Sequence, residues 1–383
     1  MRIYYTESMK IPRYYQHLSD YLKSGRVLVI YGPRQVGKTT LLKDFLIKSG
    51  LKYKLDSGED IRIQEIFESS DFSKILDYAK GYDLIAIDEA QKIKNVGQGL
   101  KILVDQIPKI KVIATGSSSF ELAGQIGEPL TGRKITLTLF PISQLELKKL
   151  YNDFELRQKL EEFLVYGGYP EVVSSDDIDE KKRILGEIVG SYLLKDILEL
   201  DKVKNSKIIL DLLRLLAFQI GNEVSLSELG RQLGIDYKTV ARYLDILEKT
   251  FVLYNLRGFS RNLRKEVTKK SKYYFYDIGI RNAIVSNFNP SSLRDDVGKL
   301  WENFIIMERI KKQENEKIYS NNYFWRTWDG KEIDWVEERE GKLYGYELKW
   351  KPKGKKSPDE WAATYKNSEY IVISQNDYLK FIC

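Results

Sequence analysis

Short apolar runs alternate with segments of helical periodicity along the first 140 residues. Each run leads into glycine, acidic or hydroxyl residues, and the segments between runs repeat apolar side chains at helical spacing, as Leu41, Leu42 and Phe45 do. Parallel strands are buried on both faces and need long crossover connections, which are usually helices. The pattern therefore predicts an α/β fold with a parallel sheet covered by helices. The predicted strands lie within residues 26–31, 83–88, 109–116 and 132–140.

After Pro141 the periodicity becomes helical. The stretch "YGGYPE" at 166–171 interrupts it, because Gly167, Gly168 and Pro170 must bend the chain sharply. Residues 225–251 contain two helical stretches around a turn, which is helix-turn-helix spacing, and two strand-like stretches follow them. These features predict a helical lid and then a helix-turn-helix with a wing.

The composition narrows the classes of protein. The 383 residues are 43% hydrophobic and 31% charged, a globular balance that suits several domains. One cysteine, Cys383, and one histidine, His17, exclude an intrachain disulfide and metal sites built on Cys or His. No apolar stretch is long enough for a membrane span, so we expect a cytoplasmic protein without membrane association. The net charge of +7 permits nucleic-acid binding but does not argue for it.

"GPRQVGKT" at 32–39 fits the pattern G-x-x-x-x-G-K-[S/T] and lies between a predicted strand and a predicted helix. Glycines let the loop curl so that its N–H groups face phosphate oxygens, and the helix start adds positive potential. Lys38 would reach the β- and γ-phosphates of ATP or ADP, while the Thr39 hydroxyl would bind Mg²⁺. The predicted nucleotide-binding residues here are Gly32, Pro33, Arg34, Gln35, Val36, Gly37, Lys38, Thr39 and Thr40.

The strand at 83–88 ends in the acids Asp88 and Glu89. Asp88 is placed to bind the magnesium shell together with Thr39, and Glu89 could polarise an attacking water. The alternative is that both acids only cap a helix. With the phosphate loop, the acid pair indicates ATP hydrolysis in which Lys38 and Glu89 are catalytic.

Two further polar groups complete the predicted nucleotide site. Thr115 or Ser117 would contact the γ-phosphate, although "TGSSS" also fits an ordinary turn at a strand end. Phosphoryl transfer often takes an additional cation from a neighbouring subunit. Arg133 is the candidate for this catalytic role in a homo-oligomer, and a simple surface arginine is the alternative.

Taken together, these motifs resemble those of the prokaryotic AAA-type ATPases, especially archaeal ones, that join a P-loop domain to a DUF4143 region. "YGPRQVGKTTLL", "LIAIDEAQ", "ATGSSSFEL", "LTGR", "FPIS", "YGGYPE", "YLLKDI", "WRTWDGKEIDWV" and "YELKW" occur in the order of that family, over nearly the whole length. The resemblance implies a P-loop NTPase core at 1–140, a helical lid at 141–204, a winged helix-turn-helix at 205–288 and a C-terminal α/β domain similar to PD-(D/E)xK nucleases at 289–383. It implies no particular substrate.

"KEIDWV" and "YGYELKW" place acids on two neighbouring strands of a predicted hairpin. Asp334 and Glu347 could converge on Mg²⁺ or Mn²⁺, with Lys349 orienting water and Glu302 arriving from the preceding helix. This matches the Glu, Asp, Glu-x-Lys series of the nuclease-like fold. The alternatives are ordinary cross-strand pairs on a solvated sheet face, or a nuclease-like domain that binds without cleaving.

Basic residues are densest around the helix-turn-helix and just after it. Such clustering favours contacts to DNA phosphates, and helix 237–249 would offer its N-terminal half to a major groove. The alternative is a winged-helix domain that packs against protein and has a solvated basic face. Two functions stay open: an ATPase whose nucleotide state controls a DNA-engaging half, and a nucleotide-dependent switch that acts on a protein partner. The basic residues are Arg231, Lys238, Arg242, Arg257, Arg261, Arg264, Lys265, Lys269, Lys270 and Lys272.

Overall fold

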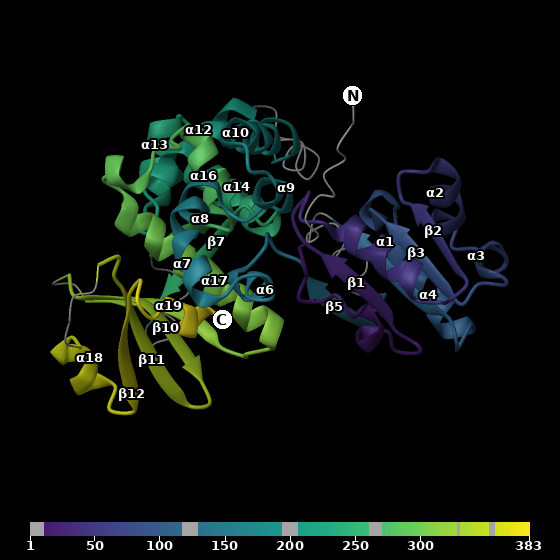
Figure 1. The fold of residues 1–383 in the computed structure, drawn as a ribbon. Coiled ribbons are helices and arrows are strands. Elements are labelled where there is room, and N and C mark those ends of the chain that lie inside the picture. Colours follow the sequence, from purple (N-terminus) through teal and green to yellow (C-terminus); the bar gives the residue numbers. More distant parts are fainter. Residues whose placement is uncertain (1–10, 117–128, 194–205, 260–269, 328–329, 352–356) are drawn as a thin grey trace, which may run out of the picture.

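The computed structural model describes residues 11–116, 129–193, 206–259, 270–327, 330–351 and 357–383. Its N-terminal part is a five-stranded parallel sheet with the strand order β2-β3-β4-β1-β5 (Figure 1). The predicted α/β fold with a parallel sheet is confirmed. The apolar pattern did not mark β2, whose edge position leaves its residues only half-buried or exposed. The strands are β1 (Val27–Tyr31), β2 (Tyr53–Ser57), β3 (Leu84–Asp88), β4 (Lys111–Gly116) and β5 (Lys134–Thr138).

Successive residues of β1 enter different hydrophobic cores, because neighbouring side chains of a strand point to opposite faces. Leu28 and Ile30 pack in a cluster with α1, whereas Val27 and Val29 pack in a second cluster with the other helices. Both faces of the sheet are therefore covered. The helices of this part are α1 (Lys38–Lys48), α2 (Ile61–Glu68), α3 (Phe72–Ala79) and α4 (Val96–Gln106), with the short turns η1 (Leu18–Tyr21) and η2 (Ala90–Lys92).

The segment after β5 is helical, as the periodicity predicts. Gly167 has φ 74°, and a Cβ atom there would lie 2.1 Å from Asp277 Oδ1, so the bend in "YGGYPE" leaves no room for a side chain. Ser143 and Asn152 each form a capping box at a helix start. The helices are α6 (Gln144–Leu147), α7 (Asp153–Gln158), α8 (Leu160–Tyr166), α9 (Pro170–Ser174), α10 (Ile178–Glu187) and the π-helix η3 (Ile188–Leu193).

Two capped helices form the predicted helix-turn-helix region. Ser225 and Asp236 accept backbone N–H groups at the two helix starts, and Gly234 ends the first helix in the left-handed conformation. An antiparallel hairpin of β7 and β8 follows. The elements are α12 (Ser206–Phe218), β6 (Glu223–Val224), α13 (Leu226–Leu233), α14 (Tyr237–Lys249), β7 (Leu253–Gly258), β8 (Ser271–Phe275) and α16 (Ile278–Ile284).

The hairpin does not stand alone, because β7 pairs in parallel with β9. One seven-stranded sheet results, in the order β12-β11-β10-β9-β7-β8-β6, and it crosses the domain boundary expected near residue 288. β10 and β11 are the antiparallel hairpin that the sequence predicts. The remaining elements are η4 (Ser291–Leu293), α17 (Val297–Glu316), β9 (Asn321–Arg326), β10 (Glu332–Arg339), β11 (Lys342–Leu348), α18 (Asp359–Thr364), β12 (Ser368–Ile373) and α19 (Tyr378–Ile382).

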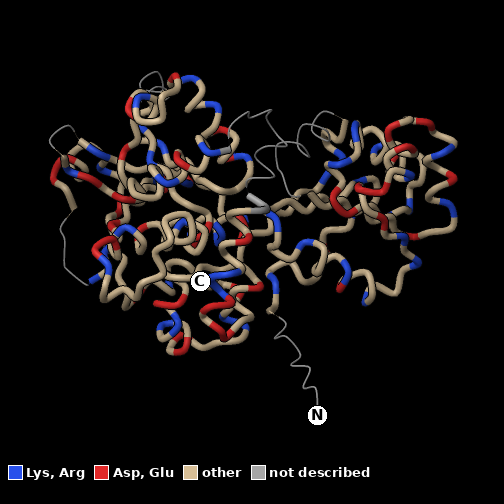
Figure 2. Tube along the Cα trace, turned by 90° about the horizontal axis from the view of Figure 1, so that it is seen from above, with Lys and Arg blue, Asp and Glu red and all other residues tan. Residues whose placement is uncertain are grey.

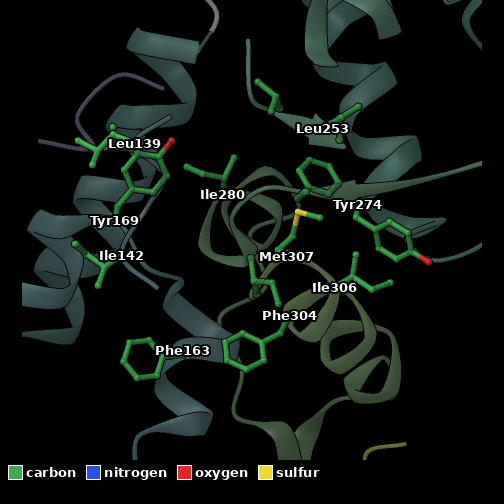
Figure 3. Packing of buried hydrophobic residues seen from close by; sticks show 14 of the residues in the cluster. Leu139, Ile142, Phe163, Tyr169, Leu253, Tyr274, Ile280, Phe304, Ile306 and Met307 are labelled. Atoms are coloured by element: carbon green, nitrogen blue, oxygen red, sulfur yellow. The ribbon is translucent and has the colours of Figure 1, made fainter. Parts of the chain in front are cut away.

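One hydrophobic cluster joins the parallel-sheet part to the rest of the chain. Leu139 and Ile142, just after β5, lie beside Tyr169, and the packing continues to Ile280 and to Met307 of α17 (Figure 3). The two parts therefore share a core as well as a linker. In the described part of the chain, every helix is too short or too polar to cross a lipid bilayer.

Candidate active site

The phosphate loop connects β1 to α1 through a backbone that needs glycine. Gly32 has φ 148° and Gly37 has φ 91°. A Cβ atom on Gly32 would lie 2.0 Å from the Leu139 carbonyl oxygen, so no side chain fits at this position. The loop is thus held against the segment that follows β5.

Lys38 lies inside this loop with its side chain buried. Its ammonium group donates hydrogen bonds to the carbonyl oxygens of Gly32, at 2.9 Å, and Pro33, at 2.7 Å. The positive charge is therefore held at the mouth of the loop, at the start of α1. A phosphate in the loop would meet an ammonium group that is already desolvated and in place.

The two carboxylate oxygens of Asp88 accept hydrogen bonds from two threonines. Thr39 Oγ1, at the start of α1, donates to Asp88 Oδ2 at 2.7 Å, and the fully buried Thr115 donates to Asp88 Oδ1 from β4. The structure thus brings together three of the predicted residues at the carboxyl ends of the parallel strands. A hydroxyl and a carboxylate oxygen are ligands that Mg²⁺ prefers, so this pair fits a magnesium ion that also binds nucleotide phosphates.

Glu89 follows Asp88 in the left-handed conformation, with φ 51°, which is uncommon for a residue with a side chain. Its carboxylate accepts a hydrogen bond of 2.6 Å from Gln91 Nε2, and its N–H donates to Thr115 Oγ1 at 3.2 Å. Gln91 is buried, and it was not among the residues predicted from the sequence. Its signal was available in "DEAQ", because a polar side chain two residues beyond the acid can reach back across a turn.

A cavity of about 1050 Å³ opens beside the loop, large enough for a nucleotide. Val36, Gly37 and Thr40 line it on one side, and the N-terminal segment 11–22 lines it on another. No role was predicted for this segment, because it carries no motif. Arg34 and Gln35 of the loop are half-buried, and Ser117 lies outside the described residues.

Arg133 stands apart from this site. Arg133 directly precedes β5, and its carbonyl accepts the N–H of Val27, the first residue of β1. Because β5 runs parallel to β1, Arg133 lies at the end of these strands that is opposite the phosphate loop. Its side chain is 44% exposed and pairs with Asp105. The predicted catalytic role could therefore be exerted only on a nucleotide of a neighbouring subunit.

A second polar cluster lies in the seven-stranded sheet. Glu302 of α17, Asp334 of β10 and Glu347 of β11 are all buried, so these acids do not belong to a solvated sheet face. Burial, together with the charges of Glu302 and Glu347, raises the pKa of Asp334 to about 7. The charges are therefore close enough to interact, as the spacing in the sequence predicts.

Two lysines enter this cluster. Lys349 Nζ lies 2.6 Å from Glu347 Oε1. Lys272 of β8 is fully buried, hydrogen bonds to Glu332 and lies 3.6 Å from Glu302 Oε1. Burial alone would lower the pKa of Lys272, but the charges of Glu302 and Glu332 outweigh it and raise that pKa.

Lys272 was expected to face DNA, but it is a buried partner of these acids, and Tyr274 beside it donates a 2.7 Å hydrogen bond to Glu302. The contact between Lys272 and Glu332 could not be predicted from the sequence, because the two residues are 60 positions apart and meet only through the pairing of strands in the sheet. Among the residues that the structure describes, no three Asp, Glu, His or Cys side chains are placed to hold a metal ion. As arranged, Glu302 and Glu332 face the ammonium group of Lys272, and Glu347 faces that of Lys349.

Basic and acidic residues are interspersed over both parts of the molecule (Figure 2). Arg261, Arg264, Lys265 and Lys269, four of the ten residues of the predicted basic region, lie outside the described residues. Lys270 pairs with Glu223 at 2.6 Å. The described residues thus carry part of the expected basic surface.

Family models match three consecutive parts of the chain. The model described as an AAA domain matches residues 24–148, which contain the phosphate loop, Asp88, Glu89 and Thr115. Residues 24–148 are therefore similar to an AAA domain. Behind this AAA domain, the domain of unknown function DUF8612 matches residues 157–291, and DUF4143 matches residues 297–381 with Glu302, Asp334 and Glu347. The resemblance to AAA-type ATPases with a DUF4143 region is thereby confirmed for those two parts.

Similar proteins occur in bacteria and archaea. An uncharacterized protein of Mycobacterium tuberculosis is 27% identical over 326 residues, which cover 84% of this chain and 70% of that protein. One of Haemophilus influenzae is 25% identical and covers 85% of this chain and 83% of that protein. One of Methanocaldococcus jannaschii is 28% identical over 318 residues, which cover 77% of this chain and 69% of that protein. The similarity therefore extends from the AAA domain into the C-terminal half of the chain.

Solved structures with partial likeness include the Thermotoga maritima RuvB Holliday junction branch migration motor and AMPPCP-bound DnaA from Aquifex aeolicus. Each is 17% identical and covers 60% of this chain. The matches cover 81% and 83% of those chains, with TM-scores of 0.29 and 0.27.

Proposed function

We propose that the chain binds and hydrolyses ATP, and that its nucleotide state controls a C-terminal half that engages DNA. The observation that carries the ATPase proposal is the meeting of Thr39, Asp88 and Thr115 beside the loop that holds Lys38. These groups come from three separate elements. They supply a cation for phosphate, oxygen ligands for a metal and an adjacent acid in one place.

The residues of the nucleotide site divide the work of binding phosphate, holding the metal and activating water. Lys38 and the loop N–H groups bind the phosphates, and the cavity beside segment 11–22 receives the base and ribose. Thr39 and Asp88 would hold Mg²⁺, which neutralises phosphate charge when bound. Glu89 orients and deprotonates the attacking water, and Gln91 holds the Glu89 carboxylate. Arg133 would act on a neighbouring subunit of a homo-oligomer.

For the C-terminal half, we interpret α13, α14 and the β7–β8 hairpin as a winged helix-turn-helix, and the sheet with α17 as a nuclease-like domain. Lys238 and Arg242 of α14 would contact DNA phosphates. Glu302, Asp334, Glu347 and Lys349 would form the nuclease-like centre. Cleavage requires these acids to exchange their ammonium partners for a metal ion, so it is the most demanding part of the proposal.

The pairing of these acids with lysine ammonium groups favours a second function. The buried ammonium of Lys272 lies between Glu302 and Glu332, where it stabilises the cluster without a metal. A nuclease-like domain neutralised in this way would serve as a rigid binding module. The protein would then be a nucleotide-dependent switch that acts on a protein partner.

One assay separates the two functions. ATP hydrolysis is measured with and without duplex or single-stranded DNA, on the wild type and on Lys38→Ala, while DNA length is followed in Mg²⁺ and Mn²⁺. The primary proposal predicts hydrolysis that DNA stimulates with a steep salt dependence and that falls at least about 100-fold in Lys38→Ala. DNA cleavage lost in Glu347→Ala or Lys349→Ala would establish the nuclease. Hydrolysis that ignores DNA and leaves it intact would support the switch on a protein partner.

A further inference from the structure

Arg13 joins three segments that are far apart in the sequence. Its Nη1 donates to the Val36 carbonyl of the phosphate loop at 2.8 Å, and its Nη2 donates to the Phe140 carbonyl after β5 at 2.6 Å. Its Nε donates to Glu146 Oε1 of α6 at 2.9 Å. The residue is only 9% exposed although it precedes the first strand. A single side chain thus holds the loop from outside the P-loop motif.

The chemistry of this contact requires arginine. Three nitrogens of one planar group reach three acceptors in different directions, whereas a lysine ammonium is a single point at the end of a flexible chain. The bonds are buried, so a missing donor would leave the Val36 or Phe140 carbonyl without its partner. Burial lowers the pKa of Arg13, and the charge of Glu146 opposes this shift.

The partners of Arg13 are themselves fixed. Glu146 closes the capping box of α6 by accepting the N–H of Ser143 at 2.9 Å, and it also accepts the N–H of Tyr14 at 2.8 Å. One residue after that cap, the N–H of Gln144 donates to Glu308 of α17 at 2.6 Å. The segment 139–147 is therefore a junction between the phosphate loop and the helix that carries Glu302.

We propose that Arg13 is a positioning residue for the nucleotide site, which sets the phosphate loop in its binding conformation and ties that conformation to the junction segment 139–147. The Val36 carbonyl and the Gly37 N–H belong to one planar peptide group, so fixing this carbonyl fixes the direction of the Gly37 N–H. Arg13 also lines the cavity beside the loop. The proposal rests on the proposed ATPase function and adds to it a residue outside the motifs that predict that function.

The test compares Arg13→Lys with Arg309→Lys in the full chain. Arg309 is a matched control, because it is also buried and also donates to a carboxylate, Glu337, and to a carbonyl, Phe381, but in the C-terminal half. Three quantities are measured for each protein: the dissociation constant of a fluorescent ADP, KM and kcat for ATP at saturating Mg²⁺, and Tm.

Both substitutions are expected to lower Tm. Only Arg13→Lys is expected to raise KM and the ADP dissociation constant, by about tenfold, with kcat changed much less, because loss of loop preorganisation weakens binding. Glu146→Gln keeps one acceptor oxygen, which can serve either Ser143 or Arg13 and Tyr14, and should shift KM in the same direction by a smaller factor. If Arg13→Ala fails to fold, Arg13→Lys still carries the test.

Two results would overturn the role of Arg13. The first is an Arg13→Lys protein that keeps the wild-type KM and ADP affinity. The second is an equal rise of KM in Arg309→Lys, since the effect would then reflect general stability. A wild-type protein that binds no ADP would instead overturn the proposed ATPase function, and the Arg13 proposal with it.

Discussion

At the residue scale, the site residues that could be predicted are those that belong to a short sequence motif. Gly32, Lys38 and Thr39 belong to one loop with a fixed spacing, and Asp88 ends an apolar strand. Arg13 and Lys272 carry no such signal, because their partners Glu146 and Glu332 lie 133 and 60 residues away. Buried polar groups must find partners, but the sequence does not say which elements supply them.

Asp334 provides a prediction about pH. Its pKa is raised to about 7, first by burial and then by Glu302 and Glu347, whereas an aspartate in an unfolded chain has a pKa of about 3.9. Between these two values the folded protein holds a proton that the unfolded chain has lost. The contribution of this group to the free energy of unfolding is therefore present at low pH and lost as pH rises towards 7.

Asp334→Asn removes this titration. The free energy of unfolding of the variant minus that of the wild type should grow between about pH 5 and about pH 7, as measured by urea denaturation. A difference that stays constant over this range would contradict the burial and the charge interactions assigned to Asp334.

At the element scale, α17 is the helix that connects the two sites. Glu302 and Arg309 are seven residues apart, so they lie on one face two turns apart, and both meet groups of the seven-stranded sheet. Glu308 accepts the N–H of Gln144, near the end of the part that matches the AAA domain. The sequence predicts the helix that carries Glu302. It does not predict that charged residues on this helix would be buried, because burial depends on the sheet and the other helices that surround it.

Glu337 connects β10 to α17, and its substitution tests how much this contact stabilises the fold. It is fully buried and accepts hydrogen bonds from Arg309 Nε at 2.6 Å and from Arg309 Nη2 at 2.9 Å. Glu337→Gln keeps the shape but leaves the Arg309 charge uncompensated, and should cost about 3 kcal/mol of unfolding free energy. Asp245→Asn, which breaks the exposed pair with Lys249, is the control and should cost less than about 1 kcal/mol. Equal costs in denaturant melts would contradict the anchoring of α17 through Glu337.

At the scale of the whole molecule, motif boundaries and structural boundaries differ. The sequence divides the chain at about residue 288, and the two family models meet at nearly the same place. The sheet nevertheless continues through β7 and β9, and the main hydrophobic cluster reaches from β1 to α19. Long-range strand pairing of this kind leaves no local pattern, since β7 and β9 each look like an ordinary strand.

This continuity predicts how fragments behave. Residues 289–383 lack β6, β7 and β8, so β9 would expose its edge and Glu302 would lose Lys272 and Tyr274. That fragment should show no cooperative thermal unfolding, whereas residues 141–383, which keep the whole sheet, should unfold cooperatively. Circular dichroism melts of the two fragments check this. A cooperative transition in 289–383 would mean that the C-terminal part folds without the hairpin.

For the whole molecule, we propose above all that the part at residues 24–148 hydrolyses ATP with Glu89 as the base. The most direct measurement is ATP binding and ATP turnover on the same samples of wild type and Glu89→Gln. Glu89→Gln keeps the side-chain shape and leaves Lys38, Thr39 and Asp88 in place. We expect ATP affinity within about threefold of the wild type and turnover lower by at least about 100-fold. Equal turnover in the two proteins, or wild-type protein that binds ATP without hydrolysing it, would contradict the role of Glu89 as the base of an ATPase.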